Sequence, residues 1–533
     1  MSGTFCLMLH SHIPYCRKSG VWPAGEEWLF EAMNECYIPL LTVLRRLHLS
    51  GIRPGITIGV VPILALQLSD GYMKARFLEY MGDKILRARY DLERFEDEPA
   101  RRRVAEYWIA VFEDNVRAYV KEFHQDIPGT LRWLQDEGAV EVVTSAATHG
   151  FLPLLSRDSA VYAQVKIGVE TYEKHFGAPP RGFWLPECAY RPAEDRDGRR
   201  RRAIDEWLSD FGVEWFIVED VGIGSAAVIE DAKGCGAPTT DRGYRLPSGV
   251  DVFGRNAATG RQVWSAEVGY PSHPEYLEFH WQDPETGLRY HRVTGKDKKD
   301  IYDPDKARLR VARDAAHFVR LLSAEVKRAK AAGVGSPVIV SPYDTELFGH
   351  WWHEGPAFIE QVCRALAKKT GIAAAGIGDF ADKNREDFQT IEMGPSTWGE
   401  NGDFTVWQNP EHGWIWPLIN DCCRQMEDVL SGIEAAGYVP DVHGVRVLKQ
   451  MGRELLLMQG SDWPFLLYTE QAREYANQRF HHHHQRFLKL LWAARDLEDR
   501  NRASDHDLSE MEDIDGVWGE IEYRIFRERE IGN

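Results

Sequence analysis

Seven short apolar segments, bounded by turn-forming residues, decide the fold class of this chain. They are residues 4–10, 55–61, 139–145, 181–187, 213–220, 261–268 and 336–344. Continuous apolar strands of this kind are buried on both faces, as in a parallel sheet. Helical patterns separate most of them, at residues 27–49, 159–176, 200–211 and 305–332. Strands that alternate with helices predict an α/β fold, and seven of them favour a closed or nearly closed barrel.

Two regions interrupt this alternation. Residues 70–137 are charged and have a helical pattern, which predicts a helical subdomain inserted between the second and third strands. From about residue 411 onward the strand patterns stop and amphipathic helices follow. We therefore expect a barrel made of residues 1–69 and 138–400, and a C-terminal helical domain over residues 401–533.

The charge of the chain excludes two classes of partner. It has 82 acidic and 64 basic residues, a formal charge of −18, so we expect neither nucleic acid nor an anionic membrane to bind it. Its eight cysteines have no metal-binding spacing. The N-terminus has no secretory pattern and no apolar run approaches a membrane span, so we expect a cytoplasmic protein. The run His481–His484 lies in a helical pattern and predicts a solvated helix surface.

Polar residues follow nearly every predicted strand. They are His10 and His12, His149, Glu187, Glu219 and Asp220, Trp264 and Glu267, and Asp344. In parallel α/β barrels the functional side chains gather at the carboxyl ends of the strands. Several polar residues at the same end therefore predict a functional site.

Glu187 and Asp344 form the best candidate pair of carboxylates. Both follow strands and lie among aromatic residues. Cleavage of a glycosidic bond uses two carboxyl groups in unlike surroundings, one ionised as the nucleophile and one protonated as the acid. A helix cap is the alternative role for Glu187.

The three histidines His10, His12 and His149 allow a metal or a sugar ligand. Zinc accepts such a set, but zinc barrels of the deacetylase and mannosidase kinds also carry an aspartate in the first strand-end motif, which here reads "HSH". Binding of sugar hydroxyl groups explains the same histidines, so we expect no metal and no cofactor. The eighteen tryptophans suit either a core or the stacking of flat sugar faces.

Four motifs give the chain a family resemblance. "HSHIPY" (10–15), "WLPECAY" (184–190), "SPYDTELFGHWWHEGP" (341–356) and "TWGENGDFTVWQN" (397–409) resemble the first, third, fourth and fifth signature regions of glycoside hydrolase family 57. The resemblance covers essentially the whole chain. The second region, "GVVPILALQL" (59–68), lacks the acidic residue that relatives often carry, so we assign it no catalytic role.

The resemblance, greatest to the family's α-glucan-branching members, implies a (β/α)7 barrel with an inserted helical subdomain and a C-terminal α-helical domain. It implies a retaining transglycosylase that cleaves α-1,4 links and forms α-1,6 branches through a glycosyl-enzyme intermediate, a step of glycogen biosynthesis. The substrate would be an α-1,4-glucan such as amylose or a glycogen-like polysaccharide. Glu187 matches the family's nucleophile and Asp344 matches its general acid/base.

The resemblance also suggests residues that would bind the glucan. Four tryptophans look like its stacking aromatics: Trp22, Trp281, Trp407 and Trp416. Asp462 would be a further contact from the helical domain, or a helix N-cap. The glycine- and proline-rich stretch 221–257 predicts a mobile loop. Within it, residues 234–249 would carry Tyr244 over the site and exclude water.

Three other functions remain open at this point. A 4-α-glucanotransferase or an α-amylase of the same family would use the same carboxylates with another acceptor. A glucan-binding protein without activity would keep the cleft but not the chemistry. A metal-dependent deacetylase would require zinc at the histidines.

Overall fold

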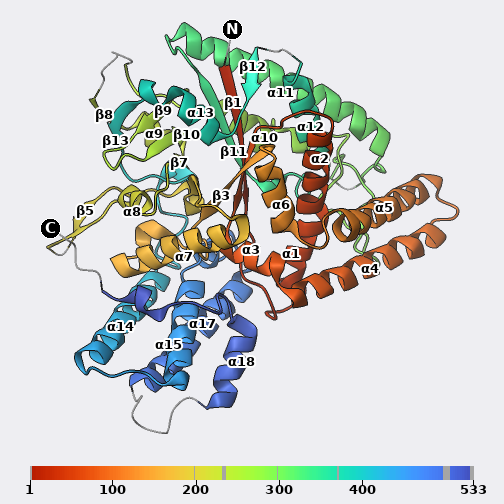
Figure 1. Ribbon diagram of the computed structural model, residues 1–533. Coiled ribbons are helices and arrows are strands. Elements are labelled where there is room, and N and C mark those ends of the chain that lie inside the picture. The colour runs from red at the N-terminus through yellow and green to blue at the C-terminus, as the bar shows by residue number, and fades with distance from the viewer. Residues whose placement is uncertain are drawn as a thin grey trace.

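A parallel barrel forms the centre of the molecule (Figure 1). The computed structural model describes residues 3–196, 198–230, 236–296, 298–368, 371–495 and 504–528. The strand order is β11-β1-β2-β3-β4-β7-β10, and all neighbours in this series are parallel. The strands are β1 (Gly3–Ser11), β2 (Ile56–Val60), β3 (Val140–Ser145), β4 (Gly182–Trp184), β7 (Trp215–Val218), β10 (Asp251–Gly254) and β11 (Val338–Asp344). The backbone N–H of Asn256, just after β10, donates to the carbonyl of Val340 on β11 at 2.8 Å, which completes the circle.

Six of these seven strands lie where the sequence predicts a strand. The prediction for the sixth apolar segment is wrong. Residues 261–268 were expected to be a strand, but they belong to α10 (Ala257–Trp264) and the loop after it. The side chain of Asn256 caps this helix by accepting from the Thr259 N–H at 3.0 Å. The missing strand is β10, inside the stretch 221–257 that was expected to be a mobile loop.

The described parts of this stretch, residues 221–230 and 236–257, are not one loop, because their short apolar runs join the sheet. They contain the end of α9 (Asp220–Gly224), then β8 (Ala227–Glu230), β9 (Gly243–Arg245) and β10. Strand β10 pairs with β7 and with β9. Its Val252 and Phe253 are completely buried, so burial overrides the local glycine and proline signals.

Helices surround the barrel. Between β1 and β2, a π-helical segment η1 (Met33–Tyr37) links α1 (Glu26–Ala32) directly to α2 (Ile38–Leu49). The other helices of the barrel region are α3 (Pro62–Ser69), α6 (Ile127–Asp136), α7 (Asp158–Phe176), α8 (Ile204–Asp210), α11 (Pro304–Ala331), α12 (Gly355–Leu366) and α13 (Ile377–Asn384). The remaining strands are β5 (Glu194–Arg196), β6 (Arg199–Arg201), β12 (Ile372–Ala374) and β13 (Gln389–Glu392).

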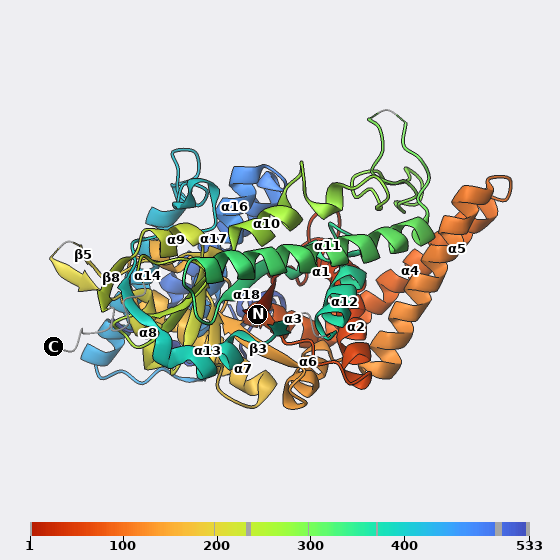
Figure 2. The same cartoon turned by 90° about the horizontal axis from the view of Figure 1, so that it is seen from above.

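A helical hairpin of α4 (Gly71–Arg94) and α5 (Pro99–Arg117) projects from one side of the barrel (Figures 1 and 2). An irregular segment before α11 packs against it. The buried carboxylate of Asp91 accepts hydrogen bonds from Thr286 Oγ1 at 2.6 Å and from the Tyr290 hydroxyl at 2.7 Å. These bonds join the hairpin to the segment that carries Phe279, Trp281 and Arg289.

The C-terminal part of the chain is helical and packs against the barrel (Figure 1). It consists of α14 (Ile415–Ala435), α15 (Val442–Met458), α16 (Asp462–Thr469), α17 (Arg473–Arg495) and α18 (Asp505–Asp515). Helix α15 is the central one, and its buried Val447, Met451 and Leu455 recur every four residues, as expected for a core-facing helix. None of the helices in the described part of the chain has the length and apolar character needed to cross a membrane.

Candidate active site

The carboxyl ends of the barrel strands open into a cleft of about 1400 Å³. The strand register places His10, near the end of β1, beside Asp344, at the end of β11. His149 follows β3 and Glu187 follows β4. Of the residues predicted to form the site, the following line the cleft: His10, His12, His149, Glu187, Trp264, Asp344 and Asp462. The fold therefore brings together side chains from four strands and from the C-terminal helices.

Glu187 lies in a short 3₁₀ turn, Pro186–Cys188, directly after β4. Its backbone is left-handed, with φ 61° and ψ 25°, a conformation that non-glycine residues adopt rarely and that clusters at active sites. One carboxylate oxygen accepts from the Ser461 hydroxyl at 2.7 Å and the other from Trp398 Nε1 at 2.9 Å. The carboxylate is thus held at both oxygens.

Asp344 has different surroundings. Burial, together with the negative charges of Glu346 and Glu187, raises the pKa of the Asp344 carboxyl well above its usual range. Burial also raises the pKa of Glu187, but the hydrogen bonds from Ser461 and Trp398 oppose this effect because they stabilise the ionised form. The two carboxyl groups therefore differ in the way that a proton donor and an ionised nucleophile should differ.

The histidines form a stacked cluster. His10 stacks on Trp184 with ring centroids 4.6 Å apart, and His12 stacks on His149 at 4.1 Å. Burial lowers the pKa of both His10 and His149 well below the usual range, with a further contribution from the charge of His12. His12 is different. Burial lowers its pKa, but Asp462, together with the charges of Glu187 and Glu346, outweighs this effect, so the pKa of His12 is raised.

Four of the six histidine nitrogens contact protein groups, and Nδ1 of His10 and Nδ1 of His12 are buried without a partner. Nε2 of His10 lies 3.0 Å from Nε2 of His149, Nδ1 of His149 lies 2.7 Å from Ser461 Oγ, and Nε2 of His12 lies 2.8 Å from Asp462. A zinc ion needs a free lone pair from each ligand, aimed at one centre. This arrangement fits hydrogen bonding better than zinc ligation.

Glu346 is a site residue that the sequence analysis missed. It lines the cleft two residues after Asp344, and it accepts hydrogen bonds from the Tyr37 hydroxyl and from the backbone N–H of His12. Burial raises the pKa of Glu346 to about 7. Tyr37 comes from the π-helical segment η1, a type of irregularity often found at functional sites. The signal was present, since Glu346 lies inside the fourth motif.

Aromatic residues form the walls of the cleft. Trp28, Trp264, Phe279 and Trp351 line it. Trp264 and Trp351 are each 42% exposed, so their faces are available to a ligand. Trp22 and Trp281 are exposed but do not line the cleft; Pro23 and Gln282, their neighbours in sequence, do.

Comparisons with known proteins agree with this architecture. The model of the family "Glycosyl hydrolase family 57" matches residues 6–391. The chain belongs to glycosyl hydrolase family 57. A second model, "1,4-alpha-glucan branching enzyme, C-terminal", matches residues 419–526 of this family-57 protein, which span most of its C-terminal helices.

Three relatives of this family-57 protein are informative. It is 44% identical to the 1,4-alpha-glucan branching enzyme of Thermococcus kodakarensis, over 92% of this chain and 73% of that one. The crystal structure of a branching enzyme from Pyrococcus horikoshii superposes with a TM-score of 0.92 at 41% identity, covering 100% of this chain and 98% of the other. The α-amylase AmyC of Thermotoga maritima has a TM-score of 0.85 at 30% identity and 100% coverage of both chains.

Two tryptophans expected to stack on glucan are buried in this family-57 protein. Trp407 is 1% exposed and its ring stacks on Phe151 with centroids 4.8 Å apart. Trp416 is 3% exposed, and its Nε1 donates to the backbone carbonyl of Trp407 at 2.8 Å. The prediction for both is wrong, because the segment after the barrel folds inward and these rings fill the core.

The expectation that Tyr244 closes over the site is also wrong. Tyr244 is fully buried on β9, opposite Val252 of β10. Its hydroxyl donates to the Thr239 carbonyl at 2.8 Å and accepts from the Thr239 N–H at 2.6 Å. A residue that is paired in a sheet and bonded at its polar end cannot swing over a cleft. Gly234, at the start of the proposed lid, lies outside the described residues.

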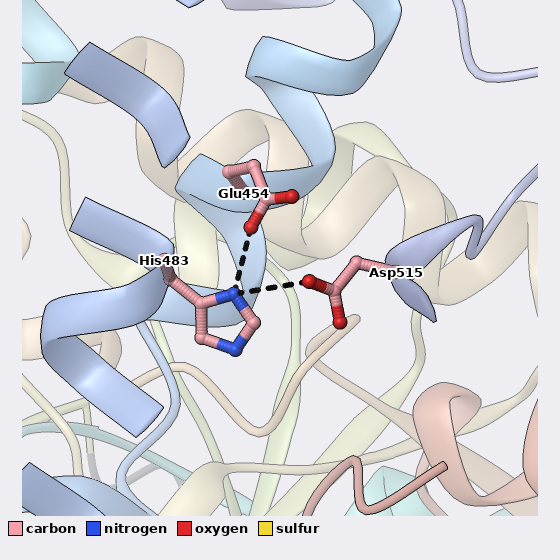
Figure 3. A group of neighbouring side chains, drawn as sticks. All are labelled: Glu454, His483 and Asp515. Carbon is pink, nitrogen blue, oxygen red and sulfur yellow. Dashed lines mark hydrogen bonds and ion pairs between the residues drawn. The ribbon is translucent and has the colours of Figure 1, made fainter. Parts of the chain in front are cut away.

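The histidine run of the C-terminal helices is not entirely a solvated surface. His483 on α17 is fully buried and its Nδ1 contacts Glu454 at 2.7 Å and Asp515 at 3.8 Å (Figure 3). Such a trio resembles a metal site, but Arg479 lies against Nε2 of His483 at 3.0 Å and Arg486 contacts Asp515. Asp515 is already paired with the Arg479 and Arg486 guanidinium groups, and Glu454 accepts a hydrogen bond from Gln450. The cluster is therefore a buried network of ion pairs and hydrogen bonds that ties three helical segments together.

Trp398 and Ser461, the two donors to Glu187, were not predicted from the sequence. Trp398 lies within the fifth motif, "TWGENGDFTVWQN", so a signal existed. Ser461 has no local signal, because only the packing of the C-terminal helices on the barrel brings it to Glu187.

Proposed function

We propose that this protein is a 1,4-α-glucan branching enzyme. The observation that carries the proposal is the pair Glu187 and Asp344, which face the same aromatic cleft from unlike surroundings. The match of residues 419–526 to the branching-enzyme C-terminal model supports transfer over hydrolysis.

The chemistry follows from the two carboxyl groups. Asp344, kept protonated, donates its proton to the glycosidic oxygen as the α-1,4 bond breaks. Glu187, held by two donors, attacks the anomeric carbon and forms a glycosyl ester. Asp344 then removes the proton from the 6-hydroxyl of an acceptor glucan, which attacks the same carbon and releases Glu187. Two inversions give net retention of the α configuration.

The cleft suits a long glucan. Trp28, Trp264, Phe279 and Trp351 line it from several segments of the chain. Aromatic rings offer flat apolar surfaces for stacking, while His12 and Asp462 offer polar groups for hydroxyls.

An α-amylase is the second candidate. The Thermotoga maritima structure named as an α-amylase covers the whole of this chain at 30% identity. Both activities use the same glycosyl ester and differ only in whether water or a sugar hydroxyl attacks it.

The test is incubation with amylose, followed by debranching and chain-length analysis. We expect new α-1,6 branches with few new reducing ends. Reducing ends alone would indicate an amylase, and longer and shorter linear chains would indicate a 4-α-glucanotransferase.

Variants and a chelator test the chemistry itself. Glu187→Gln and Asp344→Asn should each abolish turnover without unfolding the protein, and a crystal structure should place the two carboxyl groups about 5–5.5 Å apart, as in retaining enzymes. Activity should survive exhaustive treatment with EDTA. Loss of activity that zinc restores would instead favour a metal-dependent reaction at the histidines.

We also propose a cytoplasmic location. Seven cysteines of the described residues are buried free thiols, the state expected in a reducing compartment.

A further inference from the structure

One turn of the C-terminal helices lies at the end of the barrel and reaches the candidate site. It is residues 459–462, which link α15 to the first residue of α16. Its backbone is fixed to the loop after β3, where the N–H of Ser461 donates to the His149 carbonyl at 3.0 Å. The Thr148 hydroxyl donates to the Leu456 carbonyl at 2.6 Å. Gly150 and Gly460 form an antiparallel bridge. The turn is therefore a fixed part of the barrel end.

Two residues of this turn hold the chemical groups of the site. Asp462 contacts His12, and the Ser461 hydroxyl lies between His149 and Glu187, 2.7 Å from each. Ser461 is completely buried and does not line the cleft. A substrate cannot touch it, so any effect of Ser461 on the reaction acts through Glu187.

The direction of each hydrogen bond follows from what the groups can do. An ionised Glu187 only accepts, so the Ser461 hydroxyl donates to it. Ser461 Oγ then accepts from Nδ1–H of His149, and neutral His149 presents a bare Nε2. That nitrogen accepts from Nε2–H of His10, at 3.0 Å. The remaining nitrogen of His10, Nδ1, is buried without a partner, which suits an unprotonated nitrogen.

We propose that Ser461 is a positioning residue for the nucleophile, and that through it the C-terminal helices complete the hydrogen-bond series from His10 through His149 to Glu187. This inference rests on the proposed role of Glu187. It assigns the helical part of the chain a function in the chemistry, in addition to its contribution to the cleft.

The consequence for the reaction concerns the charge on Glu187. That carboxylate is ionised before attack, neutral as a glycosyl ester, and ionised again when the acceptor displaces it. A donor to the carboxylate stabilises the ionised form and favours release of the sugar from the ester. The other charged or titratable groups that face Glu187 are His12, His149, Asp344 and Asp462. They come from the loop after β1, the loop after β3, β11 and α16, and all of them remain in a Ser461 variant.

The test uses three variants of Ser461 in the full-length enzyme. Ser461→Ala removes the hydroxyl. Ser461→Thr and Ser461→Val have nearly the same shape, and only Thr keeps the hydroxyl, so their comparison separates the hydrogen bond from the packing. The control is Ser159→Ala. Ser159 is also buried and donates to a carboxylate of the C-terminal helices, Glu427, at 2.6 Å, but it lies outside the cleft.

We expect kcat for amylose to fall about tenfold to a hundredfold in the Ala and Val variants, because release of the sugar from the ester is slowed by the loss of a hydrogen bond to a charged group. The KM should not rise, because Ser461 does not face the cleft. The acidic limb of the pH profile should move to higher pH, because the pKa of Glu187 rises when a donor is lost. The Ser461→Thr variant should keep most of the wild-type activity, because it keeps the hydroxyl. The Ser159→Ala control should not shift the pH profile.

Several results would overturn the proposal. One is an unchanged acidic limb in the Ala and Val variants. A second is a loss of activity that is equal in the Ser461→Thr and Ser461→Val variants. A third is a shift of the acidic limb in Ser159→Ala as large as the shift in Ser461→Ala. A wild-type enzyme that only hydrolyses amylose would refute branching but not this role, since both reactions use the same nucleophile. Independently of turnover, ¹⁵N spectra of histidine should show His149 protonated at Nδ1, and a proton on Nε2 instead would refute the series.

Discussion

Replacing Asp462 with asparagine removes a charge beside His12 and leaves the shape of the side chain almost unchanged. Both carboxylate oxygens of Asp462 lie close to His12 Nε2, at 2.8 and 3.0 Å. The His12 and Asp462 side chains are only 11% and 15% exposed, so water screens their interaction weakly. A hydrogen bond between charged groups in such a place contributes about 1.5–3 kcal/mol.

The effect of this substitution should depend on pH. Burial lowers the pKa of His12, but Asp462, the largest of three carboxylate contributions beside Glu187 and Glu346, makes the net effect a rise, so the pKa in the folded protein lies above the reference of 6.5. A raised folded pKa contributes stability that is fully present below about pH 6.5 and is lost as the pH rises through the folded pKa. The Asp462→Asn substitution should therefore cost about 1.5–3 kcal/mol at pH 5.5 and clearly less at pH 9.

Calorimetry of the wild type and the variant at these two pH values measures the difference. We expect Asp462→Asn to lower Tm by more at pH 5.5 than at pH 9. In a His12→Gln background the cost of Asp462→Asn should no longer depend on pH, which isolates the pair. An equal fall in Tm at both pH values would show that the charge of His12 does not contribute, and the reasoning from the pair would be wrong.

Three further predictions follow from the site. Glu346→Gln removes a negative charge that raises the pKa of Asp344, so the basic limb of the kcat/KM profile should move to lower pH; an unmoved limb would contradict that coupling. Trp264→Ala should raise KM for amylose with little change in Tm, whereas Trp407→Ala, which empties a core position, should cost about 3–5 kcal/mol of stability; the opposite pattern in KM and Tm would reverse their roles. Tyr244→Phe should lower Tm, because the Thr239 N–H and carbonyl lose their partner, and leave the ratio of α-1,6 transfer to hydrolysis unchanged; a changed ratio would return Tyr244 to the mechanism.

Local pattern was a reliable guide where one strand carries its own apolar run. Strands β1, β2, β3 and β11 coincide closely with the runs at 4–10, 55–61, 139–145 and 336–344. The pattern failed at β10, a strand of four residues surrounded by glycine and proline. A strand that short is specified by its neighbours β7 and β9, and not by its own composition.

The sequence by itself also placed the two carboxylates. Glu187 and Asp344 belong to contiguous motifs at strand ends, and parallel strands bring their carboxyl ends to the same edge. Exposure of the aromatic residues could not be predicted in the same way. Trp264 faces the cleft and Trp407 fills the core, yet both stand in polar, glycine-containing stretches, because a tryptophan suits a core and a binding surface equally well.

Only the tertiary structure decided how the Glu187 carboxylate is held. Ser461 lies 274 residues from Glu187 in the sequence and 2.7 Å from it in space. No periodicity or motif links a serine in a turn between two helices to a glutamate after a barrel strand. Their contact arises because the apolar faces of the C-terminal helices bury themselves against the barrel, and the position of Ser461 is a result of that packing.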